Sequence, residues 1–326
     1  MPVWLSRTLG PLCALVLIVP GLSAAETRLK VSADPRAAFH TIQSAIDALP
    51  AKGGRIDIAP GLYREKIAVK KKGVRLVGRG RGPQEVVIVW SDSAKTAGGT
   101  FQSYTMNVEA DGFAARNLTI QNDYHLTGGP QAQAVALAVS GDRAVFDRVR
   151  LLGAQDTLYA ASRKTKPSRQ YFKNCYIEGH VDFIFGDAKA FFDRCELHAL
   201  AHDGVLITAQ SKNRPGQDSA YVFDRCVITA DPQAQNIYLG RAWRPYATVV
   251  FMRSRMLAPV QPDGWREWTP GKTQTLATAY FAEFASSGPG SRPQAREPQS
   301  HQLTASQAAG WSKKVFLAGD DRWAPR

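Results

Sequence analysis

The central part of the chain repeats a short pattern of apolar and polar positions. In most copies a phenylalanine is followed by two polar residues and then by a small or apolar residue. The five copies occupy residues 146–149, 172–175, 192–195, 223–226 and 251–254. Successive phenylalanines lie 26, 20, 31 and 28 residues apart. A period of about 20 to 30 residues with variable insertions is typical of a solenoid, whose repeats stack because none can bury its apolar face alone.

Short runs of alternating apolar and polar residues follow these phrases, as at 149–152, 175–178 and 226–229. Alternation over four or five residues predicts β-strands, and helical periodicity is scarce after residue 70. The pattern therefore predicts an all-β fold, a parallel β-helix. A β-propeller is the alternative, but the repeats are shorter than a blade of about 40 residues and lack its signature.

One amphipathic helix is predicted near the start of the repeats. Ile42, Ala45, Ile46 and Leu49 fall at positions i, i+3, i+4 and i+7. Because the open end of a β-helix must be covered, we expect this segment to be an N-terminal capping helix. Residues 286–300 are rich in Gly, Pro and Ser and predict a loop across the outside. No linker divides the chain, so residues 26–326 are expected to form a single domain.

The first 25 residues have the order of segments found in a secretory signal. Arg7 precedes an apolar run at 12–19, and small residues lead to Ala25 before the charged Glu26. The run is too short to span a bilayer. We expect a signal peptide over 1–25, cleavage near Ala25, and secretion to the periplasm or the exterior. No later segment is apolar enough to predict membrane insertion.

Composition allows a large core and a basic surface. Hydrophobic residues make up 44% of the chain and charged residues 21%, which is ordinary for a globular protein. The formal net charge is +13, and loss of Arg7 leaves 40 Lys and Arg against 28 Asp and Glu, or +12. Such a protein can meet an acidic partner, whether a polyuronide, nucleic acid or membrane surface, unless the charge serves solubility alone.

Three cysteines remain after signal cleavage, and all occupy the same position of the repeated phrase. Cys175 and Cys195 are 20 residues apart, whereas Cys195 and Cys226 are 31 apart. Neighbouring coils should place their Cα atoms about 4.8 Å apart, within disulfide range. We expect a Cys175–Cys195 disulfide with Cys226 as a buried free thiol, and the alternative is three reduced cysteines packed as small apolar side chains. Local motifs for a metalloprotease, a hydrolase with a serine elbow or a nucleotide-phosphate enzyme are absent.

Two aspartates stand at equal offsets in neighbouring repeats. Asp156 lies 10 residues after Phe146, and Asp182 lies 10 after Phe172. Stacked coils should bring the two carboxyl groups side by side, and close acids tend to separate their pKa values. Such a pair can cleave a glycoside or attack an acyl carbon. The alternative for Asp182, which lies among apolar residues, is a structural acid paired with an arginine.

Polar and aromatic residues near the acids could complete a site. Ester cleavage needs donors at the developing oxyanion, and the side-chain amides of Gln155 and Gln133 can donate. The alternative for each glutamine taken alone is a surface or structural role. Arg241 could keep Asp182 ionised, and Trp243 could stack on a sugar ring. A surface arginine beside a core tryptophan is the plainer interpretation of that pair.

Four segments together closely resemble the pectin methylesterase family, namely residues 133–137, 155–159, 181–186 and 239–243. Residues 61–65 and the pair Thr100-Phe101 also resemble that family, and the similarity runs in order from about residue 30 to 290. The resemblance implies a right-handed parallel β-helix that hydrolyses the C6 methyl esters of galacturonate units in pectin. Its products would be methanol and de-esterified pectin, and its partner would be methyl-esterified polygalacturonan rather than nucleic acid.

The resemblance also implies roles for single residues. Asp182 would be the nucleophile, Asp156 the general acid and then base, and Gln133 and Gln155 the oxyanion donors. Arg241 would orient Asp182 and contact substrate. The residues implied in binding the polymer are Trp243, Tyr159, Phe185 and Thr100. No metal or organic cofactor is implied, and a monomer is expected.

Two departures from the family pattern bear on substrate preference. Ala242 replaces a usual proline, which is expected to loosen the turn between Arg241 and Trp243, and the loop 162–169 is longer and more basic than usual. Three other functions stay open: a pectin depolymerase on the same fold, another esterase or thioesterase, and a non-catalytic carbohydrate-binding β-helix. Polygalacturonase-like Asn-Thr-Asp and Gly-His-Gly motifs are absent, which disfavours the first.

Overall fold

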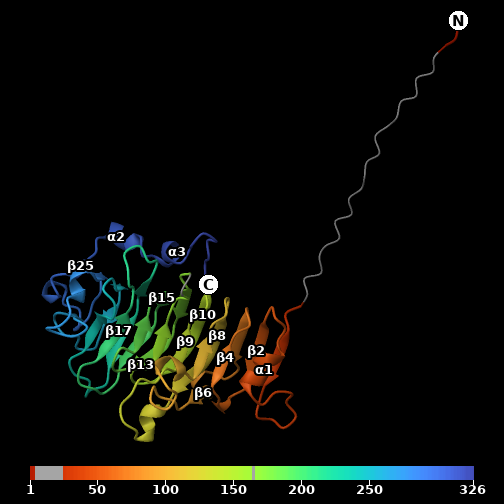
Figure 1. Ribbon diagram of the computed structural model, residues 1–326, viewed down its shortest axis with the longest axis horizontal. Coiled ribbons are helices and arrows are strands. Elements are labelled where there is room, and N and C mark those ends of the chain that lie inside the picture. Colours follow the sequence, from red (N-terminus) through yellow and green to blue (C-terminus); the bar gives the residue numbers. More distant parts are fainter. Residues whose placement is uncertain (4–24, 164–165) are drawn as a thin grey trace.

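The computed structural model describes residues 1–3, 25–163 and 166–326, and the last two of these segments form a stack of parallel strands (Figure 1). The predicted signal peptide falls mostly on residues 4–24, outside the described part. Two members of the basic loop 162–169, residues 164 and 165, are also outside it.

One face of the stack is a parallel sheet of short strands. Within the described residues it has eight strands, each in a different coil. They are β4 (Ile67–Val69), β7 (Met106–Val108), β9 (Leu137–Val139), β11 (Leu158–Ala160), β14 (Ile184–Gly186), β17 (Leu206–Gln210), β20 (Tyr238–Ala242) and β23 (Trp265–Arg266).

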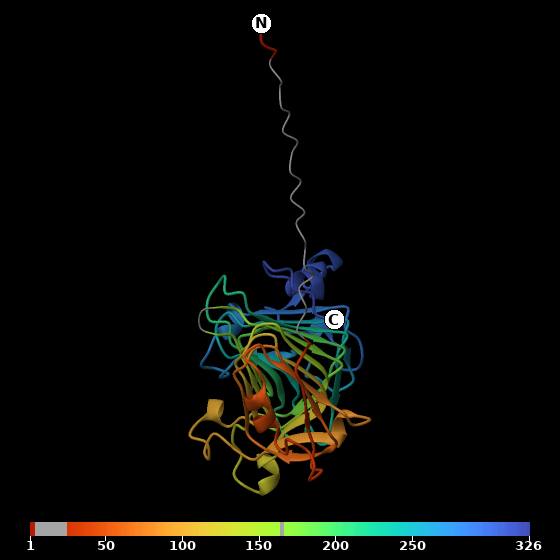
Figure 2. The same cartoon turned by 90° about the vertical axis from the view of Figure 1, so that its right-hand side faces the viewer.

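The remaining strands belong to a second parallel sheet, which has 17 strands in the described residues and forms the other two sides. They are β1 (Arg28–Val31), β2 (Gly54–Ile58), β3 (Gly61–Arg64), β5 (Val74–Gly78), β6 (Val86–Trp90), β8 (Ala114–Asn122), β10 (Ala144–Leu152), β12 (Arg169–Lys173), β13 (Tyr176–Gly179), β15 (Lys189–Asp193), β16 (Glu196–Ala199), β18 (Ala220–Asp224), β19 (Val227–Ala230), β21 (Thr248–Met252), β22 (Arg255–Met256), β24 (Tyr280–Phe284) and β25 (His301–Gln302). A typical coil therefore has three sides, and Figure 2 shows the stacked coils from the end.

The repeated phenylalanines stack inside the solenoid. Register pairs Phe146 with Phe172, then Phe192, Phe223 and Phe251 in successive coils. Their ring centroids lie 4.7, 4.7, 4.4 and 4.5 Å apart and nearly parallel. Ring spacing thus matches the spacing of parallel strands. The predicted fold class, an all-β right-handed parallel β-helix, is confirmed.

The third residue of each phrase turns the chain between two strands of the large sheet or, at Arg148, within the single strand β10. This corner residue has a left-handed backbone conformation, with φ of 53° at Arg148, 51° at Asn174, 53° at Arg194, 56° at Arg225 and 48° at Arg253. Because the same corner recurs in each coil, these side chains form a column along the solenoid. The corner is the vertex opposite the eight-stranded sheet.

The predicted capping helix is present as α1 (Ile42–Ala48). Its buried residues are Ile42, Ala45 and Ile46, and the Thr41 hydroxyl caps its first turn by accepting from the Ser44 amide. The helix packs against β1, β2 and β4 at the N-terminal end of the stack (Figure 1). No helix formed by the described residues is long and apolar enough to cross a membrane.

The C-terminal segment returns along the outside of the large sheet. It carries α2 (Ala305–Ala309) and α3 (Lys313–Phe316), which lie on one side of the stack (Figure 1). They cover apolar side chains of β12, β15, β18 and β21. Arg169 fastens it by pairing with Asp142 at 2.7 Å and with Asp321. Although it belongs to the basic loop expected to bear on substrate preference, Arg169 is therefore a structural anchor, with a side chain only 12% exposed.

The predicted disulfide between Cys175 and Cys195 is wrong. The three cysteines do stack, one residue before the paired positions Tyr176, Glu196 and Val227, but all are free and buried. Parallel strands keep the Cα–Cβ bonds of stacked residues parallel, so the Cβ atoms stay about 4.8 Å apart, whereas a disulfide needs about 3.8 Å.

Each thiol instead hydrogen-bonds to the backbone of a neighbouring coil. The Sγ atoms of Cys175, Cys195 and Cys226 donate to carbonyl oxygens at 3.4, 3.5 and 3.4 Å. Burial raises the pKa of the Cys175 and Cys195 thiols. All three cysteines are therefore small core side chains, and Cys175 and Cys195 have little thiolate character.

We expect reductant to leave Tm unchanged, because no cross-link constrains the unfolded chain. Thiol titration should count three thiols in the protein that begins at residue 26, denatured in the absence of reductant. A count of one thiol would show that two of the cysteines form a disulfide.

Candidate active site

The two aspartates lie in adjacent turns that lead into β11 and β14. Tyr159 pairs with Phe185 in the parallel ladder. Asp156 lies three residues before Tyr159, and Asp182 lies three residues before Phe185. The structure therefore brings Asp156 and Asp182 together as the equal offsets predicted. The Asp156 amide also donates to the Val181 carbonyl at 3.1 Å, which ties one turn to the next.

Local sequence aims both carboxyl groups away from the core. The residue after each aspartate, Thr157 or Phe183, is fully buried and faces inward. Asp156 and Asp182 adopt left-handed backbone conformations, with φ of 64° and 52°. This region costs a non-glycine residue about 1 kcal/mol. The buried neighbours and the bonded turns hold the strained residues in place.

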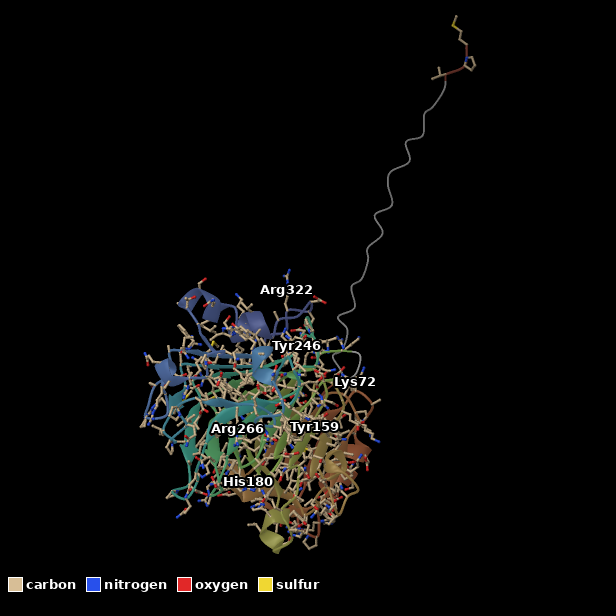
Figure 3. The ribbon with its side chains drawn as sticks, turned by 60° about the vertical axis from the view of Figure 1, so that its left-hand side comes forward. Lys72, Tyr159, His180, Tyr246, Arg266 and Arg322 are labelled. Carbon is tan, nitrogen blue, oxygen red and sulfur yellow. The ribbon has the colours of Figure 1, made fainter. Side chains whose placement is uncertain are left out.

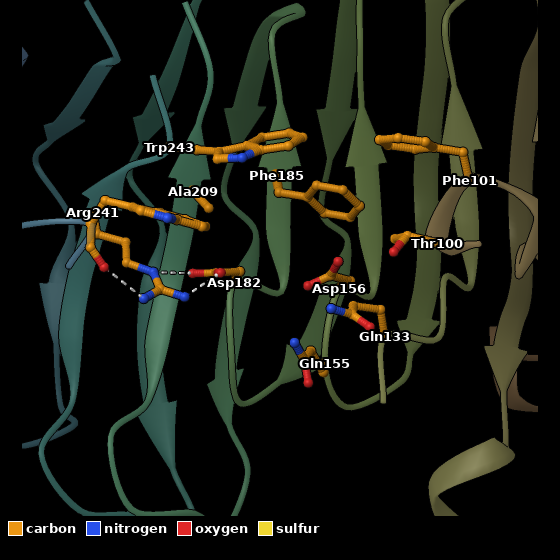
Figure 4. Close-up of a pocket in the computed structure, with 11 residues that line it drawn as sticks. Thr100, Phe101, Gln133, Gln155, Asp156, Asp182, Phe185, Ala209, Arg241 and Trp243 are labelled. Atoms are coloured by element: carbon orange, nitrogen blue, oxygen red, sulfur yellow. Dashed lines mark hydrogen bonds and ion pairs between the residues drawn. The ribbon is translucent and has the colours of Figure 1, made fainter. Parts of the chain in front are cut away.

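Both carboxyl groups open into a cleft on the outer face of the eight-stranded sheet (Figure 4). The cleft has a volume of about 220 Å³. Its lining residues come from at least seven coils or loops and are Thr100, Phe101, Gln133, Gln155, Asp156, Asp182, Phe185, Ala209, Arg241, Trp243 and Trp268. Of the nine predicted site residues, eight line this cleft, and Tyr159 lies beside it.

Arg241 holds Asp182 by a two-pronged ion pair. It extends from β20, two coils beyond β14, and its Nε and Nη2 donate to the two carboxylate oxygens at 3.0 and 2.7 Å (Figure 4). Its Nη1 donates to the Trp268 carbonyl at 3.1 Å, and its guanidinium lies 4.0 Å from the centre of that indole ring. These contacts fix the plane of the guanidinium and thus of the carboxylate.

The electrostatic surroundings separate the two acids. Burial raises the pKa of Asp156 well above its usual value, and the nearby Asp182 charge raises it further. Burial also raises the pKa of Asp182, but the hydrogen bonds and charge of Arg241 oppose that rise. Asp182 is therefore the acid that ionises first, and Asp156 the one that retains a proton.

The two glutamines lie on the same side of the cleft as Asp156 (Figure 4). No hydrogen bond from either side-chain amide to a described residue competes for its N–H groups, so both amides are free to donate to a bound group. Thr100 begins a short 3-10 helix, η2 (Thr100–Gln102), at the end of the cleft nearest Asp156. Neither the glutamines nor Thr100 belongs to the phenylalanine repeat.

A row of aromatic rings borders the acids. Phe101 contacts Tyr159, which contacts Phe185, with 4.8 Å between centroids in each pair. Trp243 follows at 6.0 Å from Phe185, and Trp268 at 6.3 Å from Trp243. Burial raises the pKa of Tyr159 to about 12, so its hydroxyl stays protonated. Rings in a row offer stacking surfaces to several consecutive sugars.

Three cleft residues were not predicted from the sequence: Phe101, Ala209 and Trp268. Phe101 adjoins the family-like Thr100, and its 48% exposure is unusual for a phenylalanine. Ala209 is in register with Phe185 and Arg241, so alignment of the coils would have found it. Trp268 lies in a loop after β23, where no repeated phrase signals its position.

Substitution of the usual proline by Ala242 does not interrupt the strand. β20 runs through Ala242, and the Trp243 amide donates to the Gln210 carbonyl at 3.1 Å. Arg241 and Trp243 both reach the cleft. A hydrogen bond between neighbouring coils therefore holds the backbone that joins Arg241 to Trp243. Among the residues that the structure describes, no group of three or more His, Cys, Asp or Glu side chains is arranged to hold a metal ion.

The fold and the cleft together define a class of protein. It is a parallel β-helix whose cleft pairs an arginine-bound carboxylate with a carboxyl of raised pKa and adjacent amide donors. The family model described as pectinesterase matches residues 28–320. Pectinesterase 31 of Arabidopsis thaliana is 36% identical over 307 residues, which cover 90% of this chain and 93% of that protein.

Solved structures agree with the sequence relatives. The pectin methylesterase from carrot has a TM-score of 0.81 at 32% identity, covering 90% of this chain and 93% of that one. The enzyme from Aspergillus niger has a TM-score of 0.79 at 31% identity, covering 93% and 98%. The chain belongs to the pectinesterase family and is an enzyme of the pectin methylesterase type.

The buried Asp156 carboxyl should lower stability at neutral pH. Because its folded-state pKa is raised, stability falls as pH rises from the unfolded value near 3.8 to the folded value, and stays lower above that. We expect Asp156→Asn to raise Tm at pH 7 by roughly 1.5–2 °C, the effect of about 1 kcal/mol in a domain of about 300 residues.

Thermal unfolding at pH 3 supplies the control, since both proteins then carry a neutral side chain and should have similar Tm values. A lower Tm for the variant at pH 7 would show that the ionised carboxylate is stabilised by its surroundings.

Proposed function

We propose that the enzyme removes methyl esters from the C6 carboxyl groups of galacturonate units in pectin, with Asp182 as nucleophile and Asp156 as acid and base. One observation carries the proposal: an arginine-held carboxylate lies beside a second carboxyl of raised pKa in one cleft. Such a pair supplies an ionised nucleophile and a proton donor at the same pH.

In the first half-reaction, an oxygen of Asp182 attacks the ester carbonyl carbon. Each carboxylate oxygen has two lone pairs, so the one used by Arg241 leaves another for attack. Gln133 and Gln155 donate amide N–H bonds to the oxyanion as it forms. When the tetrahedral intermediate collapses, Asp156 protonates the departing methoxide. Methanol leaves, and an anhydride joins the galacturonate carbonyl to Asp182.

In the second half-reaction, water hydrolyses this acyl-enzyme. Asp156, now ionised, takes a proton from the water as its oxygen attacks the galacturonate carbonyl. The intermediate releases the Asp182 carboxylate, which Arg241 stabilises as a leaving group. The products are methanol, a free C6 carboxyl group on the polymer and the starting enzyme, so atoms and protons balance without a cofactor.

The aromatic row and the family relationship support a polymeric substrate. Trp243, Tyr159 and Phe185 flank the acids and can stack on sugar rings, and Thr100 can bond a sugar hydroxyl. One structural neighbour, with a TM-score of 0.75 at 28% identity, is a pectin methylesterase in complex with a hexasaccharide. A cleft that binds several sugars would align one ester with Asp182 while neighbouring units provide binding energy.

The remaining alternatives differ in what they release. A depolymerase would create new reducing ends, a different esterase would prefer a non-pectin acyl group, and a binding module would release nothing. Methanol release without new reducing ends separates the proposed activity from all three. Family membership already favours the ester hydrolase.

We further propose that residues 26–326 act as one secreted, monomeric esterase domain after cleavage near Ala25. One apolar core cluster extends from Val31 to Phe281, and the family match covers 28–320, which supports a single unit. The order of basic, apolar and small residues over 1–25 supports export. Sedimentation of the exported protein tests the monomer.

Asp182→Asn should reduce kcat for methanol release from highly methylated pectin by at least about a thousandfold, because the amide is a poor nucleophile. Asp156→Ala should retain some activity with esters of acidic alcohols, which leave without protonation. Near-wild-type kcat in Asp182→Asn would refute the covalent mechanism, whereas retained binding with lost turnover supports it.

Arg241→Gln should shift the acidic limb of the pH–kcat profile to higher pH. Arg241 lowers the pKa of Asp182, so its loss leaves the nucleophile protonated over a wider range. Arg244→Gln is the matched control, because it removes the same charge. Arg244 lies over the Trp243 ring at 5.1 Å and does not contact Asp182. An equal shift in both variants would assign the effect to net charge.

A further inference from the structure

A second hollow lies at the vertex of the solenoid opposite the catalytic cleft. It has a volume of about 340 Å³ and spans four coils, from β2 to β10. Four arginines line it, together with small or neutral residues. The lining consists of Arg55, Val77, Gly78, Arg79, Gly80, Arg116, Asn117 and Arg148. No described residue of this hollow belongs to the proposed ester-cleaving machinery.

The local charge is strongly positive. Asp57 pairs with Arg55 at 2.8 Å and with Arg79 at 3.3 Å, and Asp147 pairs with Arg116 at 3.3 Å. Four guanidinium groups therefore face two carboxylates, which leaves a net charge of +2. The side chains of Arg79 and Arg116 are 54% and 57% exposed, so their remaining N–H groups are accessible to a ligand.

Arg148 distinguishes this hollow from the rest of the corner column. Farther along the column, Arg194, Arg225 and Arg253 pair with Asp193 or Asp224, whose side chains are only 4% exposed. Those arginines neutralise buried acids, so the stability of the fold explains their presence at the corner. Arg148 occupies the equivalent corner, yet within the described chain it makes no ion pair and no side-chain hydrogen bond. Its five N–H donors face solvent at the hollow.

The floor of the hollow is built for a close approach of backbone segments. The Asn117 side chain donates to the carbonyls of Gly78 and Gly80 at 3.2 and 2.9 Å, which fixes the segment that carries Arg79. A Cβ atom on Gly78 would lie 1.9 Å from the Asn117 carbonyl oxygen. The absence of a side chain at Gly78 thus permits this close packing, and at Gly80 a Cβ atom would lie 2.6 Å from the Glu85 side chain.

We propose that this hollow binds the free carboxylates of de-esterified polygalacturonate, the product of the proposed reaction. A guanidinium matches a carboxylate in two parallel hydrogen bonds, and several arginines at intervals of one coil suit a polymer with regularly spaced acids. The inference rests on the proposed function, because the product chain is what supplies those acids near the enzyme.

Location decides how such binding would act. The hollow and the cleft lie on opposite sides of the coil, so sugars in the cleft cannot also fill the hollow. The arginines would hold a second chain, or a distant segment of the same one, that has already lost its methyl groups. Such tethering raises the local concentration of remaining esters without changing the chemistry in the cleft.

The test compares two doubly substituted full-length proteins. Arg79→Gln with Arg148→Gln removes two charges at the hollow, and Lys314→Gln with Arg322→Gln removes two charges near the C-terminus, where Arg322 projects outward (Figure 3). Neither pair contains a member of the catalytic cleft. Fully de-esterified polygalacturonate is the probe, and Kd is measured at low and high ionic strength.

We expect the hollow variant to bind about three- to tenfold more weakly at low salt, with the difference disappearing at high salt. The C-terminal variant should bind as the unsubstituted protein does. An equal loss in both variants, no loss in either, or an equal loss of affinity for DNA in the hollow variant would overturn the proposal, since each points to unspecific charge or to no site.

A second readout separates this inference from the proposed function. Methanol release from a short methylated oligogalacturonate that fills only the cleft should have the same kcat and KM in all three proteins. If none of them releases methanol, the proposed esterase activity fails whatever the binding result. A fall in kcat confined to the hollow variant would mean that the substitutions disturb the cleft, and it would contradict an independent binding surface.

Discussion

In-register stacking of coils at about 4.8 Å is the constraint on which the rest of this structure depends. It stacks the phenylalanine rings with centroids 4.4 to 4.7 Å apart, and the same spacing places Asp156 beside Asp182. Stacking also determines what cannot form, because parallel side chains of Cys175 and Cys195 stay too far apart at Cβ for a disulfide. One geometric rule thus supports the core and positions the chemistry.

The site combines that geometry with unequal electrostatic surroundings. Two acids in equivalent turns would compete for the same proton if their surroundings were alike. Arg241 breaks the equivalence because it reaches across two coils to only one of them. Asp156 is buried beside a negative charge, and Arg241 opposes the rise of its pKa by charge alone, without a hydrogen bond, so the pKa of Asp156 is raised further. This difference between the two pKa values suits a reaction that needs an ionised nucleophile and a protonated acid at the same pH.

Positive charge has more than one role along the solenoid. Arg169 anchors the C-terminal segment, and Arg225 and Arg253 neutralise Asp224 beneath the surface. At Arg148 the column of corner residues continues without a buried acid to explain it. Net charge is therefore a poor guide to function by itself, since Arg169, Arg225 and Arg253 all form structural ion pairs.

Sequence alone determined the elements that repeat or that form continuous motifs. The phenylalanine phrase predicted the β-helix, the equal offsets of Asp156 and Asp182 predicted their proximity, and the i, i+3, i+4, i+7 pattern predicted the capping helix. Only the tertiary structure brought Trp268 and Phe101 to the cleft, because loops of irregular length carry them and no period fixes their positions. It also paired Arg169 with Asp321, which lies 152 residues away in the sequence and meets it only in the folded chain. The cysteines stay reduced because the direction of their Cα–Cβ bonds is likewise set by the folded chain.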